Sequence, residues 1–132
     1  MKEAPNEATF AALKAAKITH VVNLRRDGEP GFFLDRDTSA VLNLRIAYQR
    51  LALTTTPSKD DLELFAMILG SFPGDARVMV YCSDGNRTGG ALCVWLVKDK
   101  HLKYEAALAL AKQVGLREPE TEAAVKRALG IQ

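Results

Sequence analysis

One cysteine, followed five residues later by an arginine, has the residue types and spacing best suited to chemistry. Cys82 directly follows an apolar run at residues 77–81, and the polar stretch that comes next leads into a helical pattern from about Gly89. A buried strand that turns into a helix in this way gathers backbone N–H groups in one concavity, at the positive end of the helix dipole. We expect this loop to bind phosphate, sulfate or a similar oxyanion through Ser83, Asp84, Gly85, Asn86, Arg87 and Thr88.

The nucleophile expected in this loop is Cys82. The amide donors, the helix dipole and the Arg87 guanidinium all favour a thiolate, so we expect a lowered pKa for this cysteine. The planar fork of Arg87 matches two oxygens of a tetrahedral anion. Thr88 is placed to hydrogen-bond the sulfur or the leaving intermediate. A catalytic role for Cys82, Arg87 and Thr88 is therefore predicted.

A lone cysteine at the end of a strand is more often a small core residue than a nucleophile. The polar loop after Cys82 reverses this preference, because a core strand has no need of such a loop. Cys93, within the following helical pattern, is predicted to pack in the core. Gly85 is free to take a left-handed conformation, and Gly89 and Gly90 are expected to let the helix approach the sheet closely.

The whole chain, residues 1–132, is predicted to be a single domain. Its composition is 48% apolar and 26% charged, with a net charge of +2, which is too slight to indicate a nucleic-acid or membrane-surface partner. The longest weakly charged run, residues 78–97, is broken by Asp84 and Arg87 and does not fit a membrane span. Two cysteines are too few for a disulfide framework, and no signal peptide is visible, so a cytoplasmic location is expected.

Apolar runs alternate with segments of helical period, which is typical of an α/β domain with a small, mostly parallel central sheet flanked by helices. Ser58 is a predicted N-cap, with Asp60 and Asp61 in the first turn, and Gly115 and Gly130 are predicted C-caps. Strands are predicted at residues 18–24, 48–53 and 77–81, and helices at 6–16, 37–46, 89–98, 104–113 and 119–129. A further helix is predicted after Ser58, with Leu62, Phe65, Ala66 and Leu69 at helical spacing.

The segment Y-C-S-D-G-N-R-T-G-G at residues 81–90 resembles the H-C-x5-R-[S/T] signature of the cysteine-based tyrosine and dual-specificity phosphatases. Tyr81 replaces the histidine, and four residues instead of five separate Cys82 from Arg87. This shorter spacing resembles the beta-lactamase-hydrolase-like, phosphatase-like domain, to which residues 5–31 and the helical tail are also similar. The first strand usual in that family is missing or shortened before Pro5.

This resemblance implies a three-layer, phosphatase-like fold and hydrolysis of a phosphomonoester, of the phosphotyrosine type or a small molecule, through a phosphocysteine on Cys82. The implied chemistry needs a thiolate and fixed donors, without a metal or an organic cofactor. The expected partner is a phosphate-bearing substrate or another small oxyanion.

The general acid is the part of this resemblance that the sequence does not supply. Dual-specificity phosphatases carry an aspartate just after the strand that holds Tyr48, but residues 54–56 here are all threonine. Asp27 is favoured, because it follows the first strand at the sheet edge where open α/β folds bind ligands. Of Arg25 and Arg26, one is expected to turn toward this edge. The candidate carboxylates are Asp27, Glu29, Asp60, Asp61 and Asp84.

The short loop also resembles that of single-domain rhodaneses, Y-C-x-x-G-x-R-S, in which the cysteine carries a persulfide. A rhodanese-like sulfurtransferase that uses a Cys82 persulfide is therefore the alternative function, and a catalytically weak anion-binding module is a third. No G-H-I-x-G-A-x-N-I-P-like segment precedes the loop, whereas residues 33–53 look like the helix and tyrosine-containing strand of the phosphatases.

Overall fold

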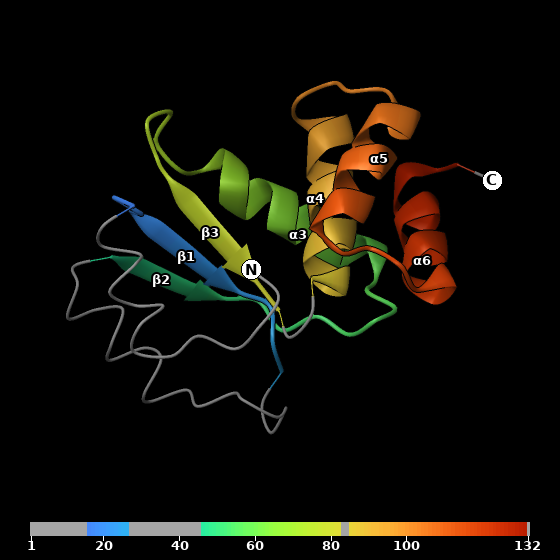
Figure 1. The fold of residues 1–132 in the computed structure, drawn as a ribbon, viewed down its shortest axis with the longest axis horizontal. Coiled ribbons are helices and arrows are strands. Elements are labelled where there is room, and N and C mark those ends of the chain that lie inside the picture. Colours follow the sequence, from blue (N-terminus) through green and yellow to red (C-terminus); the bar gives the residue numbers. More distant parts are fainter. Residues whose placement is uncertain (1–15, 27–45, 83–84, 132) are drawn as a thin grey trace.

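The structure is a computed structural model that describes residues 16–26, 46–82 and 85–131. Three short strands and four helices make up the described part (Figure 1). The strands are β1 (His20–Asn23), β2 (Ala47–Arg50) and β3 (Val78–Tyr81), and the helices are α3 (Lys59–Gly70), α4 (Asn86–Lys98), α5 (Tyr104–Val114) and α6 (Pro119–Leu129).

The three strands form one parallel sheet in the order β2-β1-β3. In this register Asn23 lies opposite both Arg50 and Tyr81, so the carboxyl ends of all three strands meet at one edge, near the start of α4 (Figure 1). The predicted α/β class with a small parallel sheet is confirmed. The helices predicted at residues 6–16 and 37–46 fall outside the described residues, except for their last residues, Ala16 and Ile46.

The second strand is shorter than predicted, because it ends at Arg50 instead of residue 53. The backbone beyond it still bonds to the segment after β1: the Leu51 N–H donates to the Asn23 carbonyl and the Leu53 N–H to the Leu24 carbonyl, both over 2.9 Å. This irregular stretch carries the chain along the carboxyl edge of the sheet before α3 begins.

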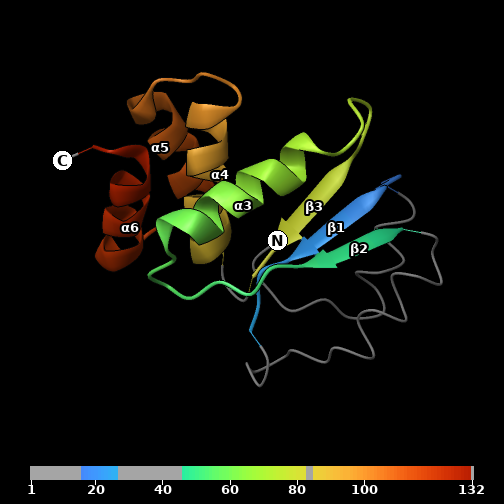
Figure 2. The same ribbon diagram turned by 180° about the vertical axis from the view of Figure 1, so that it is seen from behind.

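Helix α4 is the central helix, packed against α3 on one side and against α5 and α6 on the other (Figures 1 and 2). The core between the sheet and the helices buries Val22 of β1, Phe65 of α3, Val94 of α4 and Val125 of α6 completely. Burial of side chains of this size stabilises the fold by roughly 1.5–3 kcal/mol each. The core therefore fixes α4 relative to the sheet.

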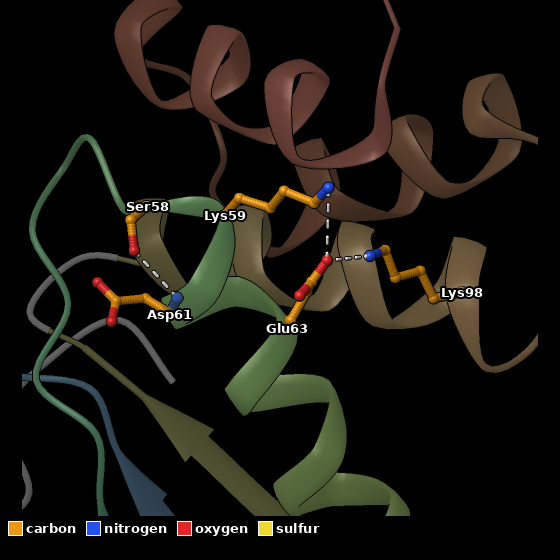
Figure 3. Close-up of polar contacts among 5 residues, drawn as sticks. All are labelled: Ser58, Lys59, Asp61, Glu63 and Lys98. Atoms are coloured by element: carbon orange, nitrogen blue, oxygen red, sulfur yellow. Dashed lines mark hydrogen bonds and ion pairs between the residues drawn. The ribbon is translucent and has the colours of Figure 1, made fainter.

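Helix α3 begins as the sequence predicts and is joined to α4 by an ion pair (Figure 3). The Ser58 Oγ accepts a hydrogen bond from the Asp61 N–H at 3.0 Å, which satisfies one of the free donors at the start of a helix. The Glu63 carboxylate lies 3.0 Å from the Lys98 ammonium of α4 and 3.8 Å from that of Lys59.

Helix α4 begins at Asn86, three residues earlier than predicted. The cause is Gly85, whose left-handed backbone (φ 88°) forms the N-cap and whose carbonyl accepts the Gly89 N–H at 2.8 Å. Arg87 and Thr88 therefore lie in the first turn of the helix and not in an extended loop. The left-handed conformation predicted for Gly85 is confirmed.

The two glycines inside α4 bring it close to other helices and not to the sheet, so the predicted partner was wrong. A Cβ on Gly89 would lie 2.6 Å from the carbonyl oxygen of Ala111 in α5 and 2.8 Å from the backbone nitrogen of Leu116, just after α5. A Cβ on Gly90 would meet the Thr121 methyl group of α6 at 3.1 Å. These positions lack side chains because three helices converge there.

Gly89→Ala should destabilise the protein, because the backbone atoms that its Cβ would meet have no room to move. We expect a loss of about 2 kcal/mol, despite the better helix propensity of alanine, and a fall in Tm of roughly 7 °C. Gly74→Ala is the matched control, since its Cβ would meet nothing within 4 Å. Equal Tm values for the two variants in thermal unfolding would contradict the packing described for α4.

The ion pair between α3 and α4 should show in the titration of Glu63. The hydrogen bond and charge of Lys98 lower the pKa of this carboxyl from its ordinary value of 4.5. A carboxyl whose pKa is lower in the folded than in the unfolded protein stabilises the folded state at pH values above its unfolded pKa. This stabilisation is lost as the pH falls through the folded-state pKa. Carbon-13 NMR should show the Glu63 pKa rise in Lys98→Met and rise less in Lys59→Met; the reverse order would refute the assignment.

Candidate active site

Cys82 is placed at the carboxyl edge of the sheet, in the first position after β3. Its side chain is fully buried, and its sulfur accepts a hydrogen bond from the Gly85 N–H at 3.1 Å. A donor aimed at the sulfur, at the start of a helix, favours the negatively charged form of a thiol. The predicted anion-binding residues Ser83 and Asp84 fall between the described segments.

Arg87 is a buried cation with a fixed anchor. Its side chain is only 6% exposed, and one terminal guanidinium nitrogen donates to the Leu53 carbonyl at 2.9 Å. Leu53 belongs to the stretch that runs along the carboxyl edge of the sheet after β2. The guanidinium is therefore tied to the same edge that carries Cys82, as an anion clamp requires.

Thr88 carries a buried hydroxyl that no other described residue satisfies, Cys82 included. The predicted hydrogen bond from this hydroxyl to the sulfur is thus not formed in this structure. A buried hydroxyl without a hydrogen-bond partner lowers the free energy of unfolding by roughly 1–3 kcal/mol. Such groups in native structures call for an explanation, and a functional role is one. Thr88 lies next to Arg87 in the first turn of α4.

The Asn86 side chain, predicted at the anion, is directed instead to the segment that leads into α6. Its Oδ1 accepts the N–H groups of Arg117 (3.0 Å) and Glu118 (3.1 Å), and its Nδ2 donates to the Glu118 carboxylate (3.0 Å) and the Thr121 hydroxyl (2.9 Å). Only the backbone of Asn86 remains a candidate anion ligand. Sequence analysis missed Glu118 and Thr121, because neither belongs to a motif and both lie more than 30 residues away.

At the end of β1, Arg25 is fully buried while Arg26 is exposed. The Arg25 N–H donates to the Asn23 Oδ1 at 3.0 Å, and the Asn23 Nδ2 donates to the Tyr48 hydroxyl at 2.9 Å. The Arg50 Nε donates to the Arg25 carbonyl at 3.4 Å. These bonds fix the backbone at this edge of the sheet; Asp27 and Glu29, which follow Arg25, lie outside the described residues.

Cys93 has the surroundings of an inert thiol. It is fully buried in α4, where desolvation, and secondly the negative charge of Glu122, raise its pKa to about 11. The thiol is therefore protonated at neutral pH, and its predicted role in core packing is confirmed.

Membrane-spanning helices and metal-ligand clusters are both absent from the described residues. No helix there is both long and apolar enough to cross a membrane, and no three His, Cys, Asp or Glu side chains gather as metal ligands would. Asp60 and Asp61 lie in the first turn of α3, at the positive end of the helix dipole.

Comparison with solved structures identifies the fold. A protein of the DUF442 group from Shewanella putrefaciens CN-32, described as a candidate phosphatase, matches with a TM-score of 0.80 and 20% identity, over 98% of this chain and 84% of that one. The protein PTPMT1, in complex with PI(5)P, matches with a TM-score of 0.74 and 16% identity, over 96% of this chain and 86% of that one. The catalytic domain of the PP-IP phosphatase SIW14 from S. cerevisiae, in complex with citrate, matches with a TM-score of 0.73 and 11% identity, over 95% and 77%.

The chain has the fold of the cysteine-based phosphatases. The family resemblance inferred from the loop is confirmed at the level of the fold. No protein-family model matches the sequence, and no curated protein matches it significantly.

The two cysteines should differ sharply in reactivity. At pH 7, iodoacetamide should alkylate Cys82 first, because the Gly85 N–H favours its thiolate, whereas Cys93 is held as a thiol by its raised pKa. Inorganic phosphate should slow the reaction of Cys82 by occupying the loop. Mass spectrometry of the peptides measures both; faster labelling of Cys93 than of Cys82 in the folded protein would contradict the site.

Proposed function

We propose that the chain is a cysteine-dependent phosphatase that hydrolyses a phosphomonoester through a phosphocysteine on Cys82. The observation that supports this most is the junction of β3 and α4. There a sulfur accepts the Gly85 N–H, and the buried Arg87 follows within the first helical turn. The structures that share this fold include phosphatases, which favours phosphate as the anion.

In the first step the Cys82 thiolate attacks phosphorus in line with the leaving oxygen. The S–P bond forms as the bond from phosphorus to the leaving oxygen breaks, and negative charge spreads over the three equatorial oxygens. Arg87 binds two of these oxygens and the loop amides bind the rest. Removing one such donor typically costs about 10²–10³-fold in rate.

The leaving oxygen needs a proton, and we propose Asp27 as its donor. This residue comes two positions after Arg25, whose backbone is fixed at the carboxyl edge of the sheet. Asp60 and Asp61 serve the start of α3, and the residues at the family's usual acid position are threonines. General acid catalysis contributes roughly 10²–10⁴-fold, and least when the leaving group is as acidic as p-nitrophenol.

In the second step water attacks phosphorus and gives a proton to the Asp27 carboxylate left by the first step. The S–P bond breaks, and inorganic phosphate leaves with the thiolate restored. The thiolate is a poor leaving group unless a donor stabilises it. We assign this donor to the Thr88 hydroxyl, which is buried and has no other hydrogen-bond partner among the described residues. Binding of the phosphate is expected to bring the hydroxyl and the sulfur into contact.

The substrate class is a phosphomonoester of the phosphotyrosine type or a small molecule, and other small oxyanions should compete with it. The mechanism uses a thiolate and fixed donors, so it requires neither a metal nor an organic cofactor.

Hydrolysis of p-nitrophenyl phosphate tests the proposal. Cys82→Ser should abolish turnover, and Arg87→Lys should lower kcat/KM by about 10²-fold, because an ammonium does not replace the bidentate fork. Asp27→Asn should slow hydrolysis of phenyl phosphate far more than that of p-nitrophenyl phosphate, because only the first requires a strong proton donor. Cys93→Ala is the matched control and should keep wild-type turnover.

Phosphate hydrolysis by Cys82→Ser at the wild-type rate would rule out the covalent mechanism. Transfer of sulfur from thiosulfate to cyanide, without any phosphate hydrolysis, would favour the rhodanese-like alternative. Binding of phosphate with neither activity would leave an anion-binding module.

A further inference from the structure

We propose that Thr121, on α6, is a positioning residue for Arg87. This inference rests on the proposed function, since it concerns the residue that would bind the phosphate oxygens. Thr121 is fully buried and lies 34 positions after Arg87 in the sequence. It is not itself a ligand of the anion, and its effect on the site passes through other residues.

The Thr121 hydroxyl connects two segments of the site through hydrogen bonds. It accepts the Nδ2–H of Asn86, the first residue of α4, and donates to the Thr55 carbonyl in the stretch between β2 and α3. A hydroxyl has one hydrogen to donate, and both the donor and the acceptor role are used here. The hydroxyl therefore bridges the first turn of α4 to residue 55.

Arg87 joins the same two segments directly, by its bond to the Leu53 carbonyl. Arg87 is thus bonded to the Leu53 carbonyl directly, and its neighbour Asn86 is connected to the Thr55 carbonyl through the Thr121 hydroxyl. The bridge through Thr121 fixes the distance between the helix turn that carries the guanidinium and the backbone that anchors it. Without this bridge, the guanidinium keeps its bond to the Leu53 carbonyl but loses one constraint on its position.

The rest of the Thr121 side chain is also held in place. Its methyl group packs directly against α4 at Gly90, since a Cβ on Gly90 would lie 3.1 Å from the methyl carbon. The Asn86 side chain is held independently by the N–H groups of Arg117 and Glu118. Because packing and hydrogen bonding use different atoms of Thr121, two substitutions separate them.

Thr121→Val keeps the shape and the methyl contact but removes the hydroxyl. Thr121→Ser keeps the hydroxyl but removes the methyl group. A residue that is only structural would affect the site in proportion to the stability that each variant loses. A positioning residue predicts damage to the site in Thr121→Val and restoration by Thr121→Ser, whatever their Tm values.

The position of Arg87 can be measured without any turnover. The Cys82 thiolate attacks the CH2 carbon of iodoacetate and of iodoacetamide alike and displaces iodide. The ratio of the two rates therefore cancels the degree of ionisation and reports the local positive charge. Each rate is divided by that of the same reagent with glutathione. Wild type should give a ratio above one, and Arg87→Met should abolish the excess. Val125→Ala is the control and should keep the wild-type ratio, because it removes core packing one turn further along α6 and leaves the hydrogen bonds of the bridge in place.

We expect the ratio in Thr121→Val to fall by up to about fourfold, toward the Arg87→Met value, because moving a charge from about 4 to about 5 Å weakens its attraction enough to change a rate by that factor. The ratio should stay at the wild-type value in Thr121→Ser. If Thr121→Val does not fold, Thr121→Ala takes its place with the same expected fall. Three outcomes would each overturn the proposal. The variant without the hydroxyl could keep the wild-type ratio, Thr121→Ser could show an equal fall, or the ratio in wild type could prove independent of Arg87. Absence of p-nitrophenyl phosphate hydrolysis, with the ratios as expected, would refute only the proposed function.

Discussion

The turn at Gly85 is the constraint on which the candidate active site depends. Its left-handed backbone directs the N–H toward the Cys82 sulfur and starts α4 at the next residue. No other residue fits there, because a side chain would be strained at φ 88° and its Cβ would lie 2.5 Å from the Val114 carbonyl oxygen of α5. The same turn places Arg87 and Thr88 at the positive end of the helix dipole. One glycine thus determines both where the sulfur finds its donor and where the cation lies.

The first turn of α4 is held from two sides, which gives the site its rigidity. Arg87 reaches the Leu53 carbonyl beside the sheet, whereas Asn86 reaches the start of α6 through four hydrogen bonds. Donors fixed before the substrate arrives need little reorganisation when charge develops on the phosphoryl group. The buried Thr88 hydroxyl is the exception, since no described residue satisfies it. The proposed anion site is therefore largely preorganised, and the Thr88 hydroxyl is its one donor without a hydrogen-bond partner among the described residues.

Local patterns in the sequence predicted those parts of the fold that local physics determines. The Ser58 cap, the start of α6 at Pro119 and the end of β3 before Cys82 all follow from residue preferences within a few positions. The early start of α4 was missed because its polar first turn has the composition of a loop. The role proposed for Thr121 could not be predicted, because this residue and its partners, Asn86 and Thr55, come from three separate segments that only tertiary packing brings together. The identity of the general acid also depends on tertiary structure, and Asp27 remains a prediction.

The central claim is that Cys82, the loop amides and Arg87 together enclose one tetrahedral oxyanion. A crystal structure with orthovanadate tests it most directly, because vanadate takes the five-coordinate geometry of phosphoryl transfer. We expect vanadium bonded to the Cys82 sulfur. The Arg87 guanidinium should donate hydrogen bonds to two equatorial oxygens, and the N–H groups of the first turn of α4 should donate to the others. Vanadate bound elsewhere, or a Cys82 sulfur without bonded vanadium at a saturating vanadate concentration, would contradict this arrangement.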